Sequence, residues 1–353
     1  MANIMVNEAC NLDCPYCFAG EFVGQTAKEM TVEDFRTALN FALSDTEEKQ
    51  VGIIGGEPLL YTHIEEVLRI AIDDVRTHAV MLYTNAVHLE LLPDDILKNR
   101  KFRMLVNCNS PEDIGEDAFN KMTDNLFRFQ KEHEGDGRFR LSVNIYKPDF
   151  DYSYVMWFAQ EMKFDVIRLS ISVPKGGDLG GKTPVEYFND MKMVSMRFVC
   201  DMIRMGVITG FDCNFLPKCS LTEEEFDSVN GPKEIFYETI EKRYSNSFWE
   251  RAIVCEVHNC SPVIDILPDL QAIRCFGLSE YTKQDIRNFK NIKQLRKFYA
   301  DNVDRPAIGV STSPECDNCM DRQLGTCSCG CLLFKAPELF KDGNMPAKAD
   351  AWA

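Results

Sequence analysis

The sequence predicts an α/β fold, a partial (β/α)6 barrel followed by a cysteine-rich C-terminal domain. The first half of the chain alternates short apolar runs with amphipathic helical stretches, a pattern typical of a mainly parallel sheet. A Gly- and Pro-rich break, PKGGDLGGKTP, follows at residues 174–184. Eleven of the 15 cysteines lie in three groups, at 10–17, 255–275 and 316–331.

Six strands and their helices account for the barrel. Apolar or alternating runs predict strands at residues 3–7, 51–55, 79–85, 102–109, 140–146 and 166–173. Apolar residues at helical spacing predict helices at residues 31–44, 64–76, 117–133 and 152–162. Thr31, three residues before Asp34, resembles a helix N-cap. Six strands are fewer than the eight of a closed barrel, so an open barrel is expected.

The chain is expected to divide at its composition breaks. Residues 1–180 form the partial barrel, and residues 181–250 form a bridging region that begins with a long helical pattern at 185–206. Residues 251–335 hold the C-terminal cysteines, and residues 336–353 read as a loose tail.

Composition excludes several classes of protein. The net charge of −16 leaves no basic surface for a phosphate backbone, so nucleic acid is not an expected partner. No apolar run reaches the roughly 20 residues of a membrane span, and the N-terminus lacks the pattern of a signal peptide. We therefore expect a cytoplasmic protein without a membrane partner. In that compartment, grouped cysteines indicate metal binding or redox chemistry rather than disulfides.

The segment CNLDCPYCF places Cys10, Cys14 and Cys17 on one loop, directly after the first predicted strand. Loops at the carboxyl ends of barrel strands are where such folds carry their chemistry. Three thiolates can hold three corners of an iron–sulfur cubane and leave one iron open to a small molecule. The alternative is a zinc site completed by a distant residue.

The segment resembles the cluster loop of the radical S-adenosylmethionine (SAM) enzymes, whose pattern is C-x3-C-x-aromatic-C, with Tyr16 at the aromatic place. GGEP after the second strand resembles the family's glycine-rich motif for the amino group of SAM; its members here are Gly55, Gly56, Glu57 and Pro58. Asn85 and Asn107 end the next two strands, where the family places polar contacts to SAM. Both asparagines are equally well explained as turn residues. Cys108 is expected to be a small buried residue.

This resemblance implies SAM and a SAM-binding 4Fe-4S cluster as cofactors. It also implies that a 5′-deoxyadenosyl radical, formed after one-electron reduction, abstracts hydrogen from a substrate. The electron would come from an external donor of the flavodoxin or ferredoxin type. No catalytic side chain is identified.

The C-terminal cysteines resemble the SPASM domain, which holds auxiliary iron–sulfur clusters in some radical SAM enzymes. ILPDLQAIRC (266–275) resembles that domain's β-hairpin, with Leu270 at a place where the pattern has glycine. By this resemblance a first auxiliary 4Fe-4S cluster would be held by Cys255, Cys260, Cys275 and Cys331.

A second auxiliary cluster would have three ligands, Cys316, Cys319 and Cys327. The family takes the fourth from a cysteine further downstream, and residues 332–353 contain none. Cys329 could substitute, the cluster could keep an open iron, or it could be absent. A zinc ribbon is the alternative for this group. Cys213 and Cys219 have no place in the pattern; packing is the preferred role for them, and a redox pair or a position near the substrate are the alternatives. His258 is expected to be a surface residue or a residue beside the ligands.

Members of the family with a SPASM domain act on peptides and proteins, so oxidative or cross-linking modification of a peptide or protein is the predicted function. A sulfatase-maturase-like enzyme is an alternative, although Phe276 stands where those enzymes carry aspartate. From a different class, a non-catalytic iron–sulfur electron carrier or a zinc-binding interaction protein remains open.

Overall fold

The structure is a computed structural model that describes residues 2–24, 28–44, 49–133, 138–174, 177–211, 216–225, 263–324, 327 and 330–343. Its strands are β1 (Ala2–Met5), β2 (Gln50–Ile54), β3 (Ala79–Thr84), β4 (Phe102–Asn107), β5 (Phe139–Ile145), β6 (Val166–Ile171), β7 (Ile208–Phe211), β8 (Ile264–Ile266), β9 (Gln271–Ile273) and β10 (Gln284–Asp285). The first six lie where the sequence predicts strands.

The helices alternate with the barrel strands and then continue beyond them. They are α1 (Val32–Ala42), α2 (Ile64–Asp73), α3 (Asp94–Leu97), α4 (Pro111–Ile114), α5 (Glu116–Glu132), α6 (Ser153–Met162), α7 (Pro184–Arg204), α11 (Ser279–Thr282), α12 (Ile292–Tyr299), α13 (Arg305–Ile308), α14 (Met320–Gln323) and α15 (Ala336–Leu339). Thr31 caps α1 as expected, because its side chain accepts a hydrogen bond from the backbone N–H of Asp34.

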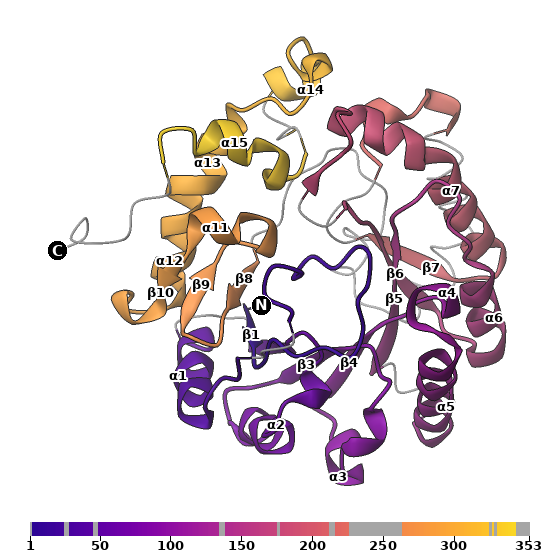
Figure 1. Ribbon diagram of the computed structural model, residues 1–353, viewed down its shortest axis with the longest axis vertical. Coiled ribbons are helices and arrows are strands. Elements are labelled where there is room, and N and C mark those ends of the chain that lie inside the picture. Colours follow the sequence, from indigo (N-terminus) through magenta and orange to yellow (C-terminus); the bar gives the residue numbers. More distant parts are fainter. Residues whose placement is uncertain are drawn as a thin grey trace.

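One curved sheet organises the molecule, with strand order β10-β9-β8-β1-β2-β3-β4-β5-β6-β7. The strands from β8 to β7 run parallel, while β8, β9 and β10 pair antiparallel. Figure 1 shows the helices α1, α2, α5, α6 and α7 as a ring outside this sheet. In the described residues β7 and β10 are free edges, so the sheet is an open barrel and the predicted fold class is confirmed.

The two faces of the sheet differ in chemistry. On β5, Leu141, Val143 and Ile145 are fully buried in the main apolar core, toward the helices. The alternate residues Ser142 and Asn144 lie on the other face, as the period of a strand requires. The ring of helices thus covers an apolar face, while the concave face of the barrel carries polar side chains.

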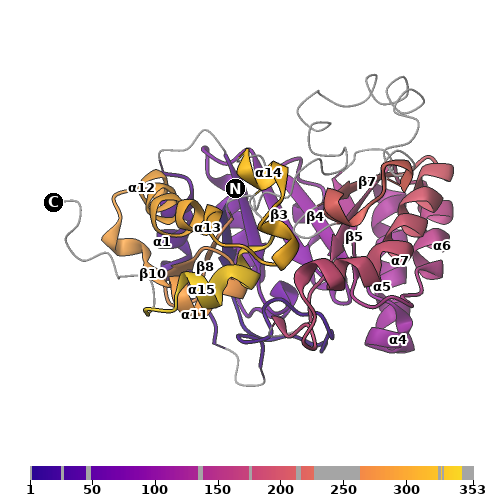
Figure 2. The ribbon, with the colours of Figure 1, turned by 90° about the horizontal axis from the view of Figure 1, so that it is seen from above.

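The C-terminal part of the chain extends the sheet at its β1 edge. β8 pairs in parallel with β1, and Asn3 on β1 donates a 2.8 Å hydrogen bond to the buried carboxylate of Asp265 on β8. Seen from above, α12 and α13 lie near α1, on the opposite side from α6 and α7 (Figure 2). The predicted division into domains remains a prediction, but strands from the predicted C-terminal domain complete the sheet of the first.

α15 lies in the segment expected to be a loose tail. Lys335, just before it, is fully buried and donates a 2.8 Å hydrogen bond to the carbonyl oxygen of Ala307. Phe340, just after it, stacks on Tyr281 with ring centroids 4.8 Å apart. Residues 336–340 are therefore packed against α11 and α13, contrary to the expectation for this part of the tail.

None of the helices in the described ranges is long and apolar enough to cross a membrane.

Candidate active site

The loop after β1 brings three thiols together at the carboxyl end of the barrel. Cys10, Cys14 and Cys17 are half-buried. A hydrogen bond of 3.1 Å from the backbone N–H of Cys17 to the carbonyl oxygen of Cys14 closes a tight turn. Burial raises the pKa of Cys10 to about 11 and that of Cys14 to about 12, and the negative charges of neighbouring cysteine thiolates raise both pKa values further. The three thiols therefore lie close enough on one loop to interact electrostatically.

The described residues contain no group of three or more His, Cys, Asp or Glu side chains placed to hold a single metal ion. A cubane cluster holds its thiolates further apart than one ion does, because iron and sulfide atoms lie between them.

Gly55 and Gly56 let the loop after β2 pack on the backbone that leads into Cys10. A Cβ on Gly56 would lie 2.3 Å from the carbonyl oxygen of Ala9, and one on Gly55 would lie 2.0 Å from Oδ1 of Asn7. This close approach allows the N–H of Gly56 to donate to Asn7 (3.0 Å) and the N–H of Glu57 to donate to Ala9 (2.6 Å). Glycine at these positions therefore fixes the position of the cysteine loop.

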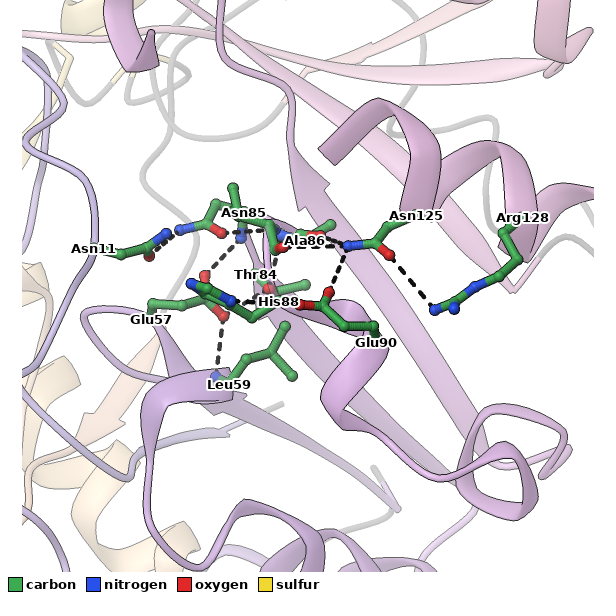
Figure 3. Close-up of polar contacts among 11 residues, drawn as sticks. Asn11, Glu57, Leu59, Thr84, Asn85, Ala86, His88, Glu90, Asn125 and Arg128 are labelled. Carbon is green, nitrogen blue, oxygen red and sulfur yellow. Dashed lines mark hydrogen bonds and ion pairs between the residues drawn. The ribbon is translucent and has the colours of Figure 1, made fainter. Parts of the chain in front are cut away.

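Glu57 joins the ends of β2 and β3 (Figure 3). Its carboxylate is buried and accepts hydrogen bonds from the N–H of Leu59 (3.0 Å), the hydroxyl of Thr84 (2.6 Å) and the N–H of Asn85 (2.7 Å). Burial raises the pKa of Glu57 to about 7, while these hydrogen bonds act in the opposite direction. Both carboxylate oxygens thus accept hydrogen bonds from the chain itself. Pro58 begins the short turn that follows.

The loop after β3 is held from its other side by α5 (Figure 3). Asn125 donates hydrogen bonds to the carbonyl oxygens of Ala86 (3.0 Å) and Val87 (3.2 Å), and Ala86 has a left-handed φ of 59°. In front of this loop, the amide of Asn85 donates a 2.9 Å hydrogen bond to Asn11 in the cysteine loop. Asn85 therefore contacts the cysteine loop, and its contact with SAM stays a prediction.

Tyr16 connects the cysteine loop to the concave face of the barrel. Its ring is buried, and its hydroxyl donates to Oδ1 of Asn109 and accepts a 3.2 Å hydrogen bond from Asn107. The polar chain continues from Asn144 to Asn107 (2.6 Å) and from Ser172 to Asn144 (3.0 Å). Polar side chains from three successive strand ends therefore line one edge of the barrel beside the cysteines.

Sequence reasoning missed Asn11, Asn109, Asn144 and Ser172. Asn144 and Ser172 alternate with apolar residues in their strands, and the same alternation that predicted the strands could have assigned them to the concave face. Cys108, as expected, is buried, and burial raises the pKa of its thiol.

The C-terminal cysteines divide between described and undescribed parts of the chain. Cys255, Cys260, Cys329 and Cys213, like His258, lie outside the described residues. Cys275, Cys316, Cys319, Cys327 and Cys331 are half-buried, and Cys219 is exposed. Cys275 follows the β8–β9 hairpin, whose turn holds Leu270 at a left-handed φ of 65°. Leu270, which stands where the SPASM pattern has glycine, thus adopts a backbone conformation that favours glycine.

Residues 4–134 match the family model of the radical SAM superfamily. This part of the chain is a radical SAM domain. The match contains the cysteine loop, GGEP and the ends of β3 and β4, which are the structural features described above. The C-terminal cysteine-rich region follows this radical SAM domain in the same chain.

The names of the curated relatives of the radical SAM domain describe different reactions. A GTP 3′,8-cyclase of Chlorobaculum tepidum is 34% identical over 95 residues, which cover 27% of this chain and 28% of that protein. A 7,8-dihydro-6-hydroxymethylpterin dimethyltransferase of Methanocaldococcus jannaschii is 32% identical over 91 residues, 26% of this chain and 18% of that protein. A GTP 3′,8-cyclase of Listeria monocytogenes is 27% identical over 254 residues, 66% of each. The chain spans about half or less of the length of the first curated relatives it matches.

Two solved structures share the fold over most of the chain. SuiB of Streptococcus suis, bound to S-adenosylmethionine, has a TM-score of 0.57 and 16% identity, covering 94% of this chain and 72% of SuiB. The protein anSMEcpe, with bound AdoMet and the Cp18Cys peptide, has a TM-score of 0.60 and 15% identity, covering 91% of this chain and 86% of anSMEcpe. The likeness extends beyond the radical SAM domain into the C-terminal region.

Proposed function

We propose that this protein is a radical SAM enzyme that modifies a peptide or protein by abstracting a hydrogen atom. The observation that carries the proposal is the convergence of Cys10, Cys14 and Cys17 beside a glycine-rich loop, at the mouth of an open barrel with a polar concave face. When bound, a 4Fe-4S cluster would supply the electron that cleaves SAM to the 5′-deoxyadenosyl radical.

The residues present fit such a cluster. Three thiols lie on one loop, and neighbouring thiolate charges raise the pKa values of Cys10 and Cys14 beyond the effect of burial, so the set is suited to a positively charged iron centre. Burial raises the pKa of Cys14, and the neighbouring Tyr16 acts in the opposite direction. Tyr16 also fixes the loop against β4 through Asn107 and Asn109.

For SAM itself, the loops after β2, β3 and β4 form the surroundings of the cysteines. Glu57 holds the Asn85 loop in place through three hydrogen bonds. A direct contact of Glu57 with the SAM ammonium stays a prediction, as do contacts from Gly55, Gly56, Asn85 and Asn107.

A peptide substrate is favoured by two observations. SuiB bound to the precursor peptide SuiA and anSMEcpe bound to the Cp18Cys peptide both share this fold over more than nine tenths of the chain. The net charge of −16 also favours a neutral or basic peptide over an anionic nucleotide. The similarity to GTP 3′,8-cyclases makes GTP the competing substrate to test.

In this proposal the C-terminal region supplies electron transfer. Cys255, Cys260, Cys275 and Cys331 would hold a first auxiliary cluster, which would supply an acceptor for the electron released when the substrate radical is oxidised. An external flavodoxin- or ferredoxin-type protein reduces the SAM cluster.

The test begins with anaerobic reconstitution of the full chain with iron and sulfide, followed by dithionite and SAM. We expect 5′-deoxyadenosine by liquid chromatography and mass spectrometry. The triple variant C10A/C14A/C17A should lose that product, whereas Cys200→Ala on α7, a cysteine with no assigned role, should keep it. Absence of 5′-deoxyadenosine from wild-type protein that contains its clusters would contradict the proposal.

The substrate class is tested with the same reconstituted enzyme. Synthetic peptides rich in Cys, Ser or aromatic residues are compared with GTP as stimulants of 5′-deoxyadenosine formation. A peptide that loses two hydrogen atoms in mass supports the proposal. Conversion of GTP with no change in any peptide would replace it by the cyclase alternative.

A further inference from the structure

Cys316 and Cys319 repeat the backbone turn formed by Cys14 and Cys17. The backbone N–H of Cys319 donates to the carbonyl oxygen of Cys316 at 3.3 Å, as that of Cys17 does to Cys14 at 3.1 Å. Both are C-x2-C turns closed by the same backbone hydrogen bond. Cys327 is tied to the same turn, because its N–H donates to the carbonyl oxygen of Asp321 at 3.0 Å.

This turn is held rigidly. Arg322 donates hydrogen bonds to the carbonyl oxygens of Cys316 (3.4 Å) and Gly309 (3.1 Å), and to the carboxylate of Asp317 (3.1 Å). The hydroxyl of Thr312 lies 4.0 Å from Sγ of Cys316. A hydroxyl beside a sulfur is an interaction that suits a sulfur ligand of an iron–sulfur cluster. These contacts anchor the turn that carries Cys316 and Cys319.

Helix α7 contacts both the segment that precedes Cys316 and the segment that carries Cys219. The N–H of Val185, in the first turn of α7, donates a 3.4 Å hydrogen bond to Ser313, next to the C-x2-C turn. Two turns further along, Lys192 pairs with Glu225 at 3.0 Å, so that residues 216–225 also lie on α7. The short turn Lys218–Ser220 packs on the same helix and carries Cys219.

Cys219 is presented outward from this turn. The neighbours Leu216 and Ser220 are buried, and Ser220 donates 2.8 Å and 2.7 Å hydrogen bonds, through its N–H and hydroxyl, to the carbonyl oxygen of Pro217. Cys219 itself is exposed. Although its side chain reaches solvent, the Cys219 thiol is partly covered, which raises its pKa, and it interacts electrostatically with Cys316, Cys327 and Cys319.

We propose that Cys219 is the fourth thiolate of a closed 4Fe-4S cluster held with Cys316, Cys319 and Cys327. The inference rests on the proposed function only in the choice of iron, since four thiolates also suit zinc. Each thiol loses one proton on binding iron. With four protein ligands, no iron remains open, so this cluster transfers electrons without binding substrate. It also joins the segment after β7 to the C-terminal region.

The test counts iron in the background C10A/C14A/C17A, which removes the SAM cluster and makes the result independent of SAM cleavage. After anaerobic reconstitution, iron, zinc and sulfide are measured together with electron paramagnetic resonance (EPR) spectra of reduced and oxidised protein. Cys219→Ala should lose about four iron atoms per chain, or convert one cluster to a three-iron form. Cys316→Ala should behave in the same way.

Three further variants test the proposal. Cys200→Ala is the matched control and should keep all its iron. Cys219→Ser, which supplies an oxygen ligand, should keep the iron with an altered EPR spectrum, provided that circular dichroism shows a folded protein. Unchanged iron and EPR in folded Cys219→Ala would overturn the proposal. The proposal would also be overturned if Cys329→Ala lost the cluster while Cys219→Ala kept it. Zinc bound by the four thiolates in place of iron would overturn it as well.

Discussion

Substitution of Gly56 by alanine tests whether the glycine-rich loop positions the cysteine loop. The added Cβ would lie 2.3 Å from the carbonyl oxygen and 2.6 Å from the carbonyl carbon of Ala9, and 2.8 Å from the carbonyl oxygen of Glu8. Because these are backbone atoms, they cannot move aside by rotation of a side chain. To reach an ordinary contact of 3.4 Å, residues 8–9 or the 55–57 loop must shift by about 1.1 Å.

That shift has a cost that can be worked from the structure. Overpacking of this kind costs about 1–3 kcal/mol. The hydrogen bonds from Gly56 to Asn7 and from Glu57 to Ala9 would weaken, each worth about 0.5–1.5 kcal/mol net. We therefore expect the free energy of unfolding to fall by roughly 2–5 kcal/mol. Because the displaced backbone adjoins Cys10, iron incorporation at the SAM cluster should also fall.

The assay compares Gly56→Ala with Gly24→Ala, a matched control on the cysteine loop where an added Cβ meets nothing within 4 Å. Chemical unfolding of the metal-free protein measures stability, and iron content after anaerobic reconstitution measures cluster assembly. The control should match wild type in both. If Gly56→Ala also matches the control in both, the glycine does not position the cysteine loop and the reasoning is wrong.

Two further predictions concern the junction between the barrel and the C-terminal region. Leu270→Ala and Leu270→Gly both remove a buried side chain, costing about 2–5 kcal/mol. Only glycine relieves the left-handed backbone at φ 65°, so it should be more stable than alanine by about 1 kcal/mol in urea unfolding, and the reverse order would contradict this. Burial raises the pKa of Asp265 from 3.8 to about 7, so the folded state keeps a proton that the unfolded chain releases between these values. The free energy of unfolding should therefore fall by up to about 4 kcal/mol as the pH rises from about 4 to 7. In Asp265→Asn this fall should be smaller. Equal dependence of stability on pH in the two proteins would refute the prediction.

The periodic elements were predictable because each strand and helix carries its own pattern. β3 (Ala79–Thr84) and α5 (Glu116–Glu132) lie within a residue or two of the ranges expected from apolar spacing. β8 and β9 have three residues each, too few for a period to show. Their addition to the β1 edge depends on pairing with a strand from the opposite end of the sequence.

The candidate site likewise has residues that the sequence predicted and residues that depend on the fold. Cys10, Cys14 and Cys17 were predictable because their separation along one loop already limits how far apart they can lie. Asn109 and Asn144 were not, because their contacts with the Tyr16 region arise from the parallel register of β4 and β5.

The sequence alone determined the βα alternation, the three-thiol loop and the glycine-rich loop, because local spacing and local backbone freedom are written in neighbouring residues. Only the tertiary structure decided that Glu57 accepts hydrogen bonds from the chain itself, and that the segments before Cys316 and after Cys219 both contact α7. Those contacts join residues far apart in the chain. Sheet order and the packing of α7 bring them together, and no local pattern encodes either.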